Sequence, residues 1–563
     1  MTREDATRLL FDVVRARHLD RVGVVPSQAG VLATVSGERT YSDRCFRFEV
    51  RLPDAFPARL PTVVALDAPP LPHVEEDGSI CAFEREGLSL SRERPAELID
   101  EAVCKALATF ESGFHGQRWA ELYDELPQYW CRGARGHRAD AFLDLGGPSR
   151  LVVAGWVRPR KRAVRVLFVA DRQGDATSVR EYPDLSEDKL PIRTAEVPYL
   201  RLPESLLQEP LDIEALRSVE GLLAFLGGCG ARAELERLTR LSRRIQPLVV
   251  LGFPRSDREE RTPVLLQFGT KHGSIEDARE RGAPANLVRM DRESLLGRGG
   301  SRARDAHVAI VGCGSVGGQL ATQLASTGIS RLTLIDPDRL EAANVYRHVL
   351  GRADIGRRKV DALADDLRRR PYLDVDVAHE PAQKLLVHRL HRDQFDAIVV
   401  TIGDVTQSRE LQELLRDYSG IVMFTWLEPL GIGGHALTRP AGAKGCYECL
   451  FRREDGSEQV DNRSDFAAPG QTFTRSVTGC GGAYTPYSVL DATQTALLAS
   501  RALVEALDSR SGSKPSVAEL RSWRGDPRAY LDAGFRLSDR WNAHDTSATW
   551  FANDHCPVCR SKP

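Results

Sequence analysis

The sequence lacks an apolar run long enough to cross a membrane, since its longest runs, such as Leu248–Phe253, have only the length of a strand. It also lacks a surplus of either charge. Its 77 basic and 79 acidic side chains leave a formal net charge of −2, without the basic footprint of a nucleic-acid binder. The opening residues Met1–Asp5 are acidic where a secretion signal is basic and then apolar. We therefore expect a cytoplasmic protein with no membrane or nucleic-acid partner.

Cysteine is scarce and odd in number, with 11 in 563 residues, and only two Cys-x-x-Cys pairs bring any of them close together. In a reducing compartment this pattern excludes a disulfide framework and favours metal ligation and thiol chemistry. The length exceeds one hydrophobic core and predicts about three to four domains. A hydrophobic share of 42% and a charged share of 28% are ordinary for a globular protein.

The first 135 residues follow an α+β pattern. From Cys45 to Leu52, apolar Phe46, Phe48 and Val50 alternate with charged residues, which predicts a half-buried strand of an antiparallel sheet. A crossing with Pro53, Pro57 and Pro61 follows, and then a short strand at Thr62–Leu66. After a loop at His73–Gly78, Pro95 opens a helix as a first-turn proline.

This order, with Phe46–Pro53, Phe56-Pro57, Leu60-Pro61 and Asp77–Cys81, resembles the ubiquitin-conjugating enzyme family. The resemblance implies that Cys81 carries a modifier as a thioester; the alternative is a small buried hydrophobic residue. The family's loop usually reads His-Pro-Asn, and its asparagine stabilises the oxyanion. Here the loop reads His73-Val74-Glu75. Because a carboxylate opposes negative charge, Glu75 is not expected to take that role. His73 remains a candidate for it, or for a structural loop contact.

The region from about 140 to 285 has no chemical motif. Four segments are expected to be strands, and Glu214–Ile245 a helix broken at Gly227-Gly228; the strands are Arg150–Val157, Ala163–Ala170, Leu248–Phe253 and Val264–Phe268. We interpret residues 140–285 as a linker domain that spaces two active sites.

A nucleotide motif begins at the apolar segment Ala306–Val311. Glycines, a helix and a second strand ending in an acid follow it, as in a Rossmann unit; the residues are Gly312, Gly314, Gly317 and Asp336. Glycines let the backbone approach a phosphate, and the acid can bind a ribose hydroxyl. This pattern alone also fits a dehydrogenase.

The residues after the acid favour adenylation. Cations and a further carboxylate follow, at Asn344, Arg347, His348, Lys359, Asp404 and Arg409. A dehydrogenase has no use for them near the phosphates. An adenylating enzyme must stabilise charge at the α-phosphorus and hold Mg²⁺ against the leaving pyrophosphate.

This series resembles the ubiquitin-activating and ThiF-type adenylating family over residues 287–563. By that resemblance Gly312, Gly314 and Gly317 bind ATP and Asp336 binds its ribose. Asn344, Arg347 and Lys359 handle the phosphates, and Asp404 holds Mg²⁺. An arginine that reaches into a partner subunit's site is also implied, with Arg289, Arg292 and Arg298 as candidates.

Two thiol pairs near the end, Cys446 with Cys449 and Cys556 with Cys559, can form a closed tetrahedral zinc site, although they lie over 100 residues apart. The adenylating family often has such a split structural site. Redox-active pairs are the alternative. Cys480 stands among glycines ahead of an apolar helix expected from about Ser488 to Leu507. By resemblance Cys480 is the first thioester cysteine, whereas Cys313 is a small residue of the nucleotide loop.

The fold class is thus an α/β and α+β multidomain protein. The order of domains resembles bacterial fusions of a conjugating and an activating enzyme in CBASS-type antiphage operons. That resemblance implies a carrier protein, either a cGAS-like nucleotidyltransferase or a ubiquitin-like protein. The carrier would pass from Cys480 to Cys81 and then to a target amine. The resemblance also implies that the enzyme is a homodimer. Two alternatives remain: a sulfur-carrier activator with a non-catalytic N-terminal domain, and a nucleotide-binding scaffold that conjugates nothing.

Overall fold

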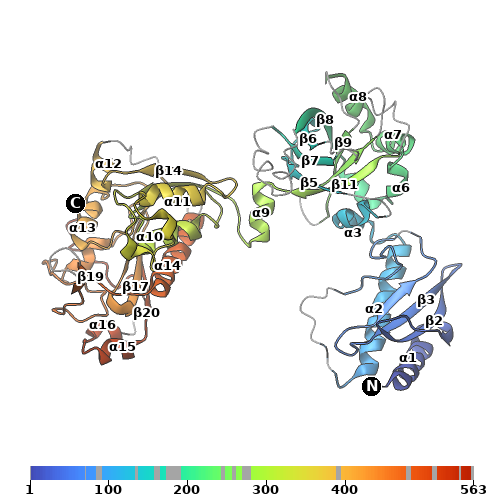
Figure 1. The fold of residues 1–563 in the computed structure, drawn as a ribbon, viewed down its shortest axis with the longest axis horizontal. Helices are drawn as coiled ribbons and strands as arrows, with labels where there is room; N and C mark the ends of the chain where they lie inside the picture. The colour runs from blue at the N-terminus through green and yellow to red at the C-terminus, as the bar shows by residue number, and fades with distance from the viewer. Residues whose placement is uncertain are drawn as a thin grey trace. The chain divides into compact units, whose positions relative to one another are not determined.

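The computed structural model describes residues 2–69, 71–83, 90, 92–132, 137–157, 165–172, 192–241, 248–256, 261–268, 281–388, 395–476, 483–509, 517–543 and 547–559. The chain forms two compact units, residues 1–291 and 292–563. Figure 1 traces both along the chain. Within the described part, no helix has the length and apolar character needed to span a bilayer.

The first unit opens with a helix, a four-stranded antiparallel sheet and a long helix. The elements are α1 (Arg3–Arg17), β1 (Asp20–Val24), β2 (Val31–Tyr41), β3 (Arg44–Pro53), β4 (Thr62–Ala65) and α2 (Pro95–Phe114). The alternation in β3 places Phe46, Phe48 and Val50 fully inside the core. Phe110 of α2 meets both phenylalanines edge to face, with ring centroids 5.1 Å apart in each pair.

Residues 119–289 form a closed seven-stranded barrel with helices outside the sheet. The strand order is β10-β11-β5-β7-β6-β8-β9. Its elements are α3 (Trp119–Asp124), α4 (Leu126–Trp130), β5 (His137–Phe142), β6 (Arg150–Val157), β7 (Arg165–Ala170), β8 (Arg193–Arg201), η2 (Glu204–Gln208), α6 (Ile213–Leu216), α7 (Val219–Gly228), α8 (Arg232–Leu241), β9 (Leu248–Phe253), β10 (Thr262–Gln267) and β11 (Ala283–Arg289). Leu287, where the sequence analysis begins the adenylating region, lies in β11 and so belongs to this barrel.

The second unit is built on a seven-stranded sheet of order β14-β13-β12-β15-β16-β17-β20, whose first five strands run parallel. Its helices and strands are α9 (Arg292–Arg298), β12 (Arg304–Val311), α10 (Ser315–Leu324), β13 (Ile329–Ile335), α11 (Lys359–Leu367), β14 (Asp374–Ala378), α12 (Ala382–His388), β15 (Ala397–Val400), α13 (Val405–Leu414), β16 (Ile421–Leu427), β17 (Gly433–Arg439), α14 (Val489–Asp508), β20 (Glu519–Arg524), α15 (Pro527–Asp532) and α16 (Asp539–Asn542).

The strand order reverses between β12 and β15, because β13 and β14 extend the sheet on one side of β12 and β15 and β16 on the other. In open α/β sheets, ligands bind at the carboxyl ends of the strands beside such a reversal. Short turns of 3-10 helix and a two-stranded ribbon complete the unit: η3 (Ala342–Asn344), η4 (Arg352–Asp354), η6 (Pro429–Gly431), η7 (Tyr447–Phe451), β18 (Arg475–Ser476) and β19 (Ala483–Tyr484).

Candidate nucleotide, thiol and metal sites

The glycine loop lies at the reversal point, between β12 and α10. Gly312 has a φ of +90°, which a side chain rarely adopts, and a Cβ on it would meet the Ile402 backbone at 3.1 Å. A Cβ on Gly317 would lie 1.9 Å from the Gly312 carbonyl oxygen. Both glycines are therefore required for α10 to start directly against the loop. The N-terminus of α10 points its unpaired N–H groups at the space where a phosphate can bind.

Asp336, at the carboxyl end of β13, is buried beneath this loop. Its Oδ2 accepts a hydrogen bond from the Cys313 N–H at 2.7 Å, and its Oδ1 accepts one from the Asp338 N–H at 2.8 Å. Each carboxylate oxygen has a further lone pair, so the oriented group can still accept a ribose hydroxyl. Burial raises the pKa of the Cys313 thiol, which fits a small structural residue in the loop.

His348 contacts the backbone of the glycine loop. Its Nε2 lies 2.7 Å from the Cys313 carbonyl oxygen, and its Nδ1 accepts a hydrogen bond from the Leu350 N–H at 3.1 Å. These partners fix the neutral tautomer with the proton on Nε2. Burial lowers the pKa of His348 accordingly.

The expected phosphate-handling residues lie on the segment after β13. The Lys359 side chain is 11% exposed, and its Nζ pairs with Asp338 Oδ2 at 2.9 Å. The Arg347 guanidinium carbon stands 5.1 Å from the centre of the Tyr487 ring. Asn344 Oδ1 accepts a hydrogen bond from the Glu341 N–H at 3.1 Å.

Asp404 follows β15 and caps α13, since its Oδ1 accepts the Gln407 N–H at 2.8 Å. The residue is exposed. One carboxylate combined with substrate phosphates is the donor set that Mg²⁺ prefers, so Asp404 fits the expected magnesium ligand. Thr401 Oγ1 donates to the Gly312 carbonyl oxygen at 2.5 Å and ties this strand end to the glycine loop.

Arg409 does not join this group, although the sequence places it just beyond Asp404. Its guanidinium binds both carboxylate oxygens of Glu448 at 2.8 Å and also Glu458 at 2.6 Å. These hydrogen bonds raise the pKa of Arg409 further. Arg409 therefore braces the η7 segment, not the nucleotide phosphates.

Four thiols converge at η7 and the C-terminal segment. Three pairs of Sγ atoms lie 3.9 Å, 3.7 Å and 3.4 Å apart, namely Cys446–Cys449, Cys446–Cys556 and Cys449–Cys559. All four fall within 4.8 Å of one another. Thiolates on a tetrahedral zinc ion with Zn–S bonds of 2.3 Å stand about 3.8 Å apart, so the cluster fits Zn²⁺.

Cys81 is exposed on the first unit, directly after a tight turn. The turn needs Gly78, whose φ is +79° and whose Cβ would meet the Ala65 carbonyl oxygen at 2.3 Å. The Cys81 N–H donates to the His73 carbonyl oxygen at 2.8 Å. The thiol therefore stands on a braced, accessible segment.

The two polar loop residues before Cys81 make structural contacts. The His73 ring is only 12% exposed and pairs with Glu121 through Nε2 and with Glu125 through Nδ1. Arg132 binds the Glu75 carboxylate at 2.5 Å. These contacts favour the structural role for His73 over an oxyanion role.

Cys480 lies outside the described residues. Of the three candidate arginines, Arg289 pairs with Asp291 at 2.8 Å, and Arg292 donates to the carbonyl oxygens of Arg304 and Gly328. Arg298 is exposed at the end of α9. Arg298 is therefore the most exposed of the three candidates.

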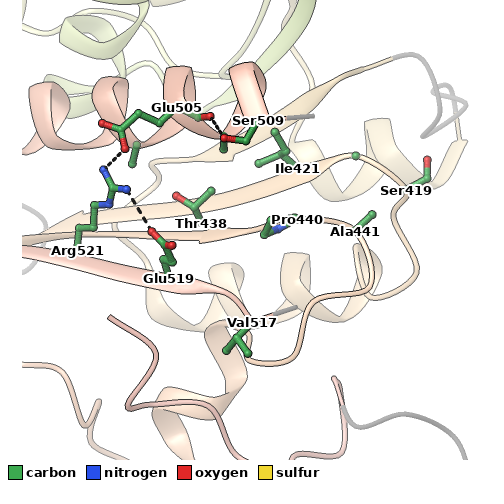
Figure 2. A pocket seen from close by; sticks show the side chains of 13 residues that line it. Ser419, Ile421, Thr438, Pro440, Ala441, Glu505, Ser509, Val517, Glu519 and Arg521 are labelled. Atoms are coloured by element: carbon green, nitrogen blue, oxygen red, sulfur yellow. Dashed lines mark hydrogen bonds and ion pairs between the residues drawn. The ribbon is translucent and has the colours of Figure 1, made fainter. Parts of the chain in front are cut away.

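Among the cavities in the described part of the second unit, two open at opposite ends of the sheet. One of about 160 Å³ adjoins Asp404, with Gly403, Trp426, Tyr447, Asn462 and Asp465 in its wall. The other, of about 140 Å³, lies where β16 begins and β17 ends. Figure 2 shows Arg521 at this second cavity, between Glu505 and Glu519. Because β15 and β16 run parallel, only the first cavity shares an edge with the nucleotide loop.

Sequence comparison agrees with both halves of this geometry. Residues 292–524 match the ThiF family, and residues 28–137 match prokaryotic E2 family B. The chain therefore combines an E2-like, ubiquitin-conjugating-type region with a ThiF-type adenylation region, the arrangement of the bacterial fusions. The family and fold class predicted from the sequence are confirmed, and the class is that of an activating and conjugating enzyme.

The relatives are of two kinds, ubiquitin transferase-like proteins and adenylyltransferase–sulfurtransferases. The ATP-dependent ubiquitin transferase-like protein Cap2 of Pseudomonas aeruginosa (strain BWHPSA011 / Pa011) is 23% identical over 479 residues, which cover 78% of this chain and 81% of the relative. Cap2 of Escherichia coli (strain TW11681) is 27% identical over 39% of each chain. The adenylyltransferase and sulfurtransferase MOCS3 of Sus scrofa is 29% identical over 42% of this chain and 56% of its own length.

The sequence did not predict two contacts of the nucleotide site. The Tyr487 hydroxyl contacts Ser315 Oγ, and the Thr401 hydroxyl donates to the Gly312 carbonyl oxygen. Thr401 directly follows the strand that leads to Asp404, and this position indicates that it lies near the site. Tyr487 stands before a helix cap with no motif around it.

Proposed function

We propose that the chain adenylates the C-terminal carboxylate of a carrier protein with ATP and Mg²⁺, takes the carrier onto Cys480, passes it to Cys81 and conjugates it to a target amine. The adenylation domain gives the carboxylate a leaving group, AMP, and each cysteine then exchanges one acyl bond for another. Covalent capture divides a difficult acylation into easier steps.

The observation that carries this proposal is the joint occurrence of two sites in one chain. The second unit sets Gly312, Asp336 and Asp404 along one edge of the sheet, and the first unit exposes Cys81 after a braced turn. In the proposed reaction Lys359 and Arg347 stabilise the charge on the phosphates, and Asp404 holds the Mg²⁺ that supplies charge neutralisation at the leaving pyrophosphate.

The cavity beside Asp404 suits the entering carboxyl end of the carrier. Trp426 and Tyr447 give it an apolar wall, and Asn462 adds a polar group. Burial, and then the neighbouring Glu428 carboxylate, raise the pKa of Asp465 well above its ordinary value. This shift favours the protonated form of Asp465 and so lowers the repulsion of an incoming carboxylate by this residue.

Three further assignments belong to this proposal. The four-cysteine cluster holds a structural zinc ion that fastens the C-terminal segment to η7 and takes no part in the chemistry. The protein is a homodimer in which Arg298 reaches the partner subunit's nucleotide site. The middle region, residues 140–285, is a linker that spaces the two active sites.

The relatives support the class of carrier that we propose. The Cap2 proteins are ubiquitin transferase-like, and the Pseudomonas aeruginosa protein matches across most of this chain. We propose that this chain acts in bacterial antiphage defence of the CBASS type, with a cGAS-like nucleotidyltransferase or a ubiquitin-like protein as the carrier.

A direct test incubates the purified chain with ATP, Mg²⁺ and the products of neighbouring genes, followed by gel electrophoresis without reductant. We expect a carrier adduct that dithiothreitol removes and that forms only with ATP. The proposal fails if no thiol-sensitive adduct forms with any neighbouring product.

The similarity to MOCS3 supports a second candidate, a sulfur-carrier activator with a non-catalytic N-terminal domain. The two candidates differ at Cys81. Cys81→Ala leaves a sulfur-carrier activator fully functional in cells, whereas it removes every conjugate from the enzyme proposed above.

A further inference from the structure

Tyr487 links two parts of the nucleotide site that are far apart in the sequence. Its hydroxyl lies 2.7 Å from Ser315 Oγ, and Ser315 is the first residue of α10 after the glycine loop. The guanidinium carbon of Arg347 stands 5.1 Å from the centre of its ring. One side chain thus touches both the helix end where phosphates bind and a cation expected to handle them.

Both contacts suit a positioning role. A guanidinium within about 6 Å of an aromatic ring is attracted to the ring face and is held in fewer orientations. The hydroxyl contact in turn restrains Tyr487 itself. Ser315 lies in the first turn of α10, and the residues that follow it, Val316 to Gly318, are buried. The half-buried Tyr487 also packs against the core formed by α10 and α14. The ring is therefore a rigid support for Arg347.

The arrangement leaves Arg347 available to an anion. The ring occupies one side of the guanidinium, but aromatic carbon accepts no N–H hydrogen bond of the kind that a phosphate oxygen offers. A phosphate at the N-terminus of α10 can therefore take the donors of Arg347 without displacing Tyr487.

We propose that Tyr487 is a positioning residue for adenylation, which holds Ser315 through its hydroxyl and Arg347 through its ring so that both flank the phosphates of ATP. This inference rests on the proposed function, since it assigns Arg347 to the phosphates of the adenylation reaction.

The two contacts can be separated by substitution. Tyr487→Phe keeps the ring and loses the hydroxyl, so we expect the Kd for ATP–Mg²⁺ to rise about five- to tenfold with a small change in kcat. Tyr487→Leu loses the ring as well. Because Arg347 then loses its orientation in the transition state, we expect kcat for ATP–pyrophosphate exchange to fall between about ten- and a hundredfold.

Tyr484→Phe is the matched control, because Tyr484 lies three residues away and is 39% exposed. It should leave both quantities unchanged. A double-mutant cycle of Tyr487→Phe with Ser315→Ala tests the hydroxyl contact alone. If the two groups act together, the double variant binds ATP as weakly as either single variant; independent groups would multiply their effects.

ATP affinity is measured by calorimetry on the full chain, and exchange is measured with a carrier. Wild-type affinity in Tyr487→Phe and Tyr487→Leu, or multiplied effects in the cycle, would overturn the inference. If the wild-type protein binds ATP but exchanges no pyrophosphate with any carrier, the proposed function fails, while the cycle still decides whether Tyr487 organises the nucleotide site. If the wild-type protein binds no ATP, both fail. Unchanged thermal unfolding midpoints show that each variant is folded.

Discussion

At the scale of single residues, Asp404 combines an observed role as a helix cap with a proposed role as a magnesium ligand, and substitution can separate the two. One carboxylate oxygen caps α13 through the Gln407 N–H, while the exposed group remains available to Mg²⁺. Asparagine caps a helix as well as aspartate does, but it is a poor magnesium ligand. Asp404→Asn should therefore lower ATP–pyrophosphate exchange by at least about a hundredfold at an unchanged thermal unfolding midpoint.

Asp404→Ala should lose the same activity and, in addition, about 1 kcal/mol of the free energy of unfolding through the missing cap. If Asp404→Asn retains exchange at wild-type rates, Asp404 is only a cap and the magnesium assignment is wrong.

His348 predicts a pH dependence with a definite sign. Its folded-state pKa lies below the ordinary value of 6.5, because the ring is buried and Nδ1 already accepts a hydrogen bond. The unfolded chain takes up a proton as the pH falls through about 6.5, whereas the folded protein resists it. The stability that His348 contributes is thus complete above that pH and is lost as the pH falls below it.

The free energy of unfolding of the wild-type protein should consequently fall more steeply between pH 7 and pH 5.5 than that of His348→Gln, which cannot titrate. Chemical unfolding at a series of pH values measures both. Equal slopes for the two proteins would exclude the buried neutral histidine as the cause.

The residues of the nucleotide site differed in how far the sequence could predict them. Gly312, Gly317 and Asp336 were predictable, because glycine is the residue that the loop backbone tolerates and an acid ends the next strand. Tyr487 was not, because its contacts join positions 172 residues apart and no local pattern encodes them. Arg409 was misleading, since a cation near a motif can pair with any acid that the fold brings close.

At the scale of elements, the four-cysteine cluster connects η7 to the C-terminal segment across 110 residues. Burial raises the pKa of the Cys446 thiol, and a bound metal ion would stabilise its thiolate form. We expect about one zinc ion per chain by elemental analysis. Cys556→Ser should remove it and lower the unfolding free energy by at least about 3 kcal/mol, or about 6 to 12 °C for a domain of this size.

Cys104→Ser is the control for the loss of a thiol, because Cys104 is exposed on α2 of the first unit. It should retain both the zinc and the unfolding midpoint. A Cys556→Ser protein that keeps its metal would show that the cluster is not the zinc site.

Helices and strands with a strong local period were predictable from the sequence. The closure of the middle strands into a barrel was not. The alternation of Phe46, Phe48 and Val50 identified β3, and the apolar stripe after Ser488 identified α14. The barrel of the middle region depends on parallel pairings such as β11 with β5, between segments almost 150 residues apart. Sequence periodicity reveals the strands of such a pairing but not their partners.

At the scale of the whole molecule, the proposed relay gives an ordered set of intermediates. Cys480→Ala should retain ATP–pyrophosphate exchange and lose every thioester, because adenylation precedes thiol attack. Cys81→Ala should accumulate carrier on Cys480, since the next acceptor is missing. Gels without reductant, followed by mass spectrometry of the adduct, identify the loaded cysteine. Normal loading of Cys81 in Cys480→Ala would contradict the relay.

A homodimer with an arginine acting between subunits predicts complementation. Arg298→Ala and Asp404→Ala should each be inactive, but a heterodimer of the two contains one site with both residues intact. Mixing equal amounts under conditions of subunit exchange should restore about a quarter of the wild-type exchange activity. A mixture as inactive as its components would argue against Arg298 acting across a dimer.

The central claim is that the second unit uses ATP to activate a carboxylate. Isotope exchange between pyrophosphate and ATP measures that step before any thiol takes part, with each candidate carrier compared against the same carrier lacking its last residue. The proposed mechanism predicts exchange that requires Mg²⁺ and the intact carrier and that persists in the Cys81→Ala, Cys480→Ala double variant. Exchange absent with every carrier, or equal with and without the carrier's last residue, would contradict it.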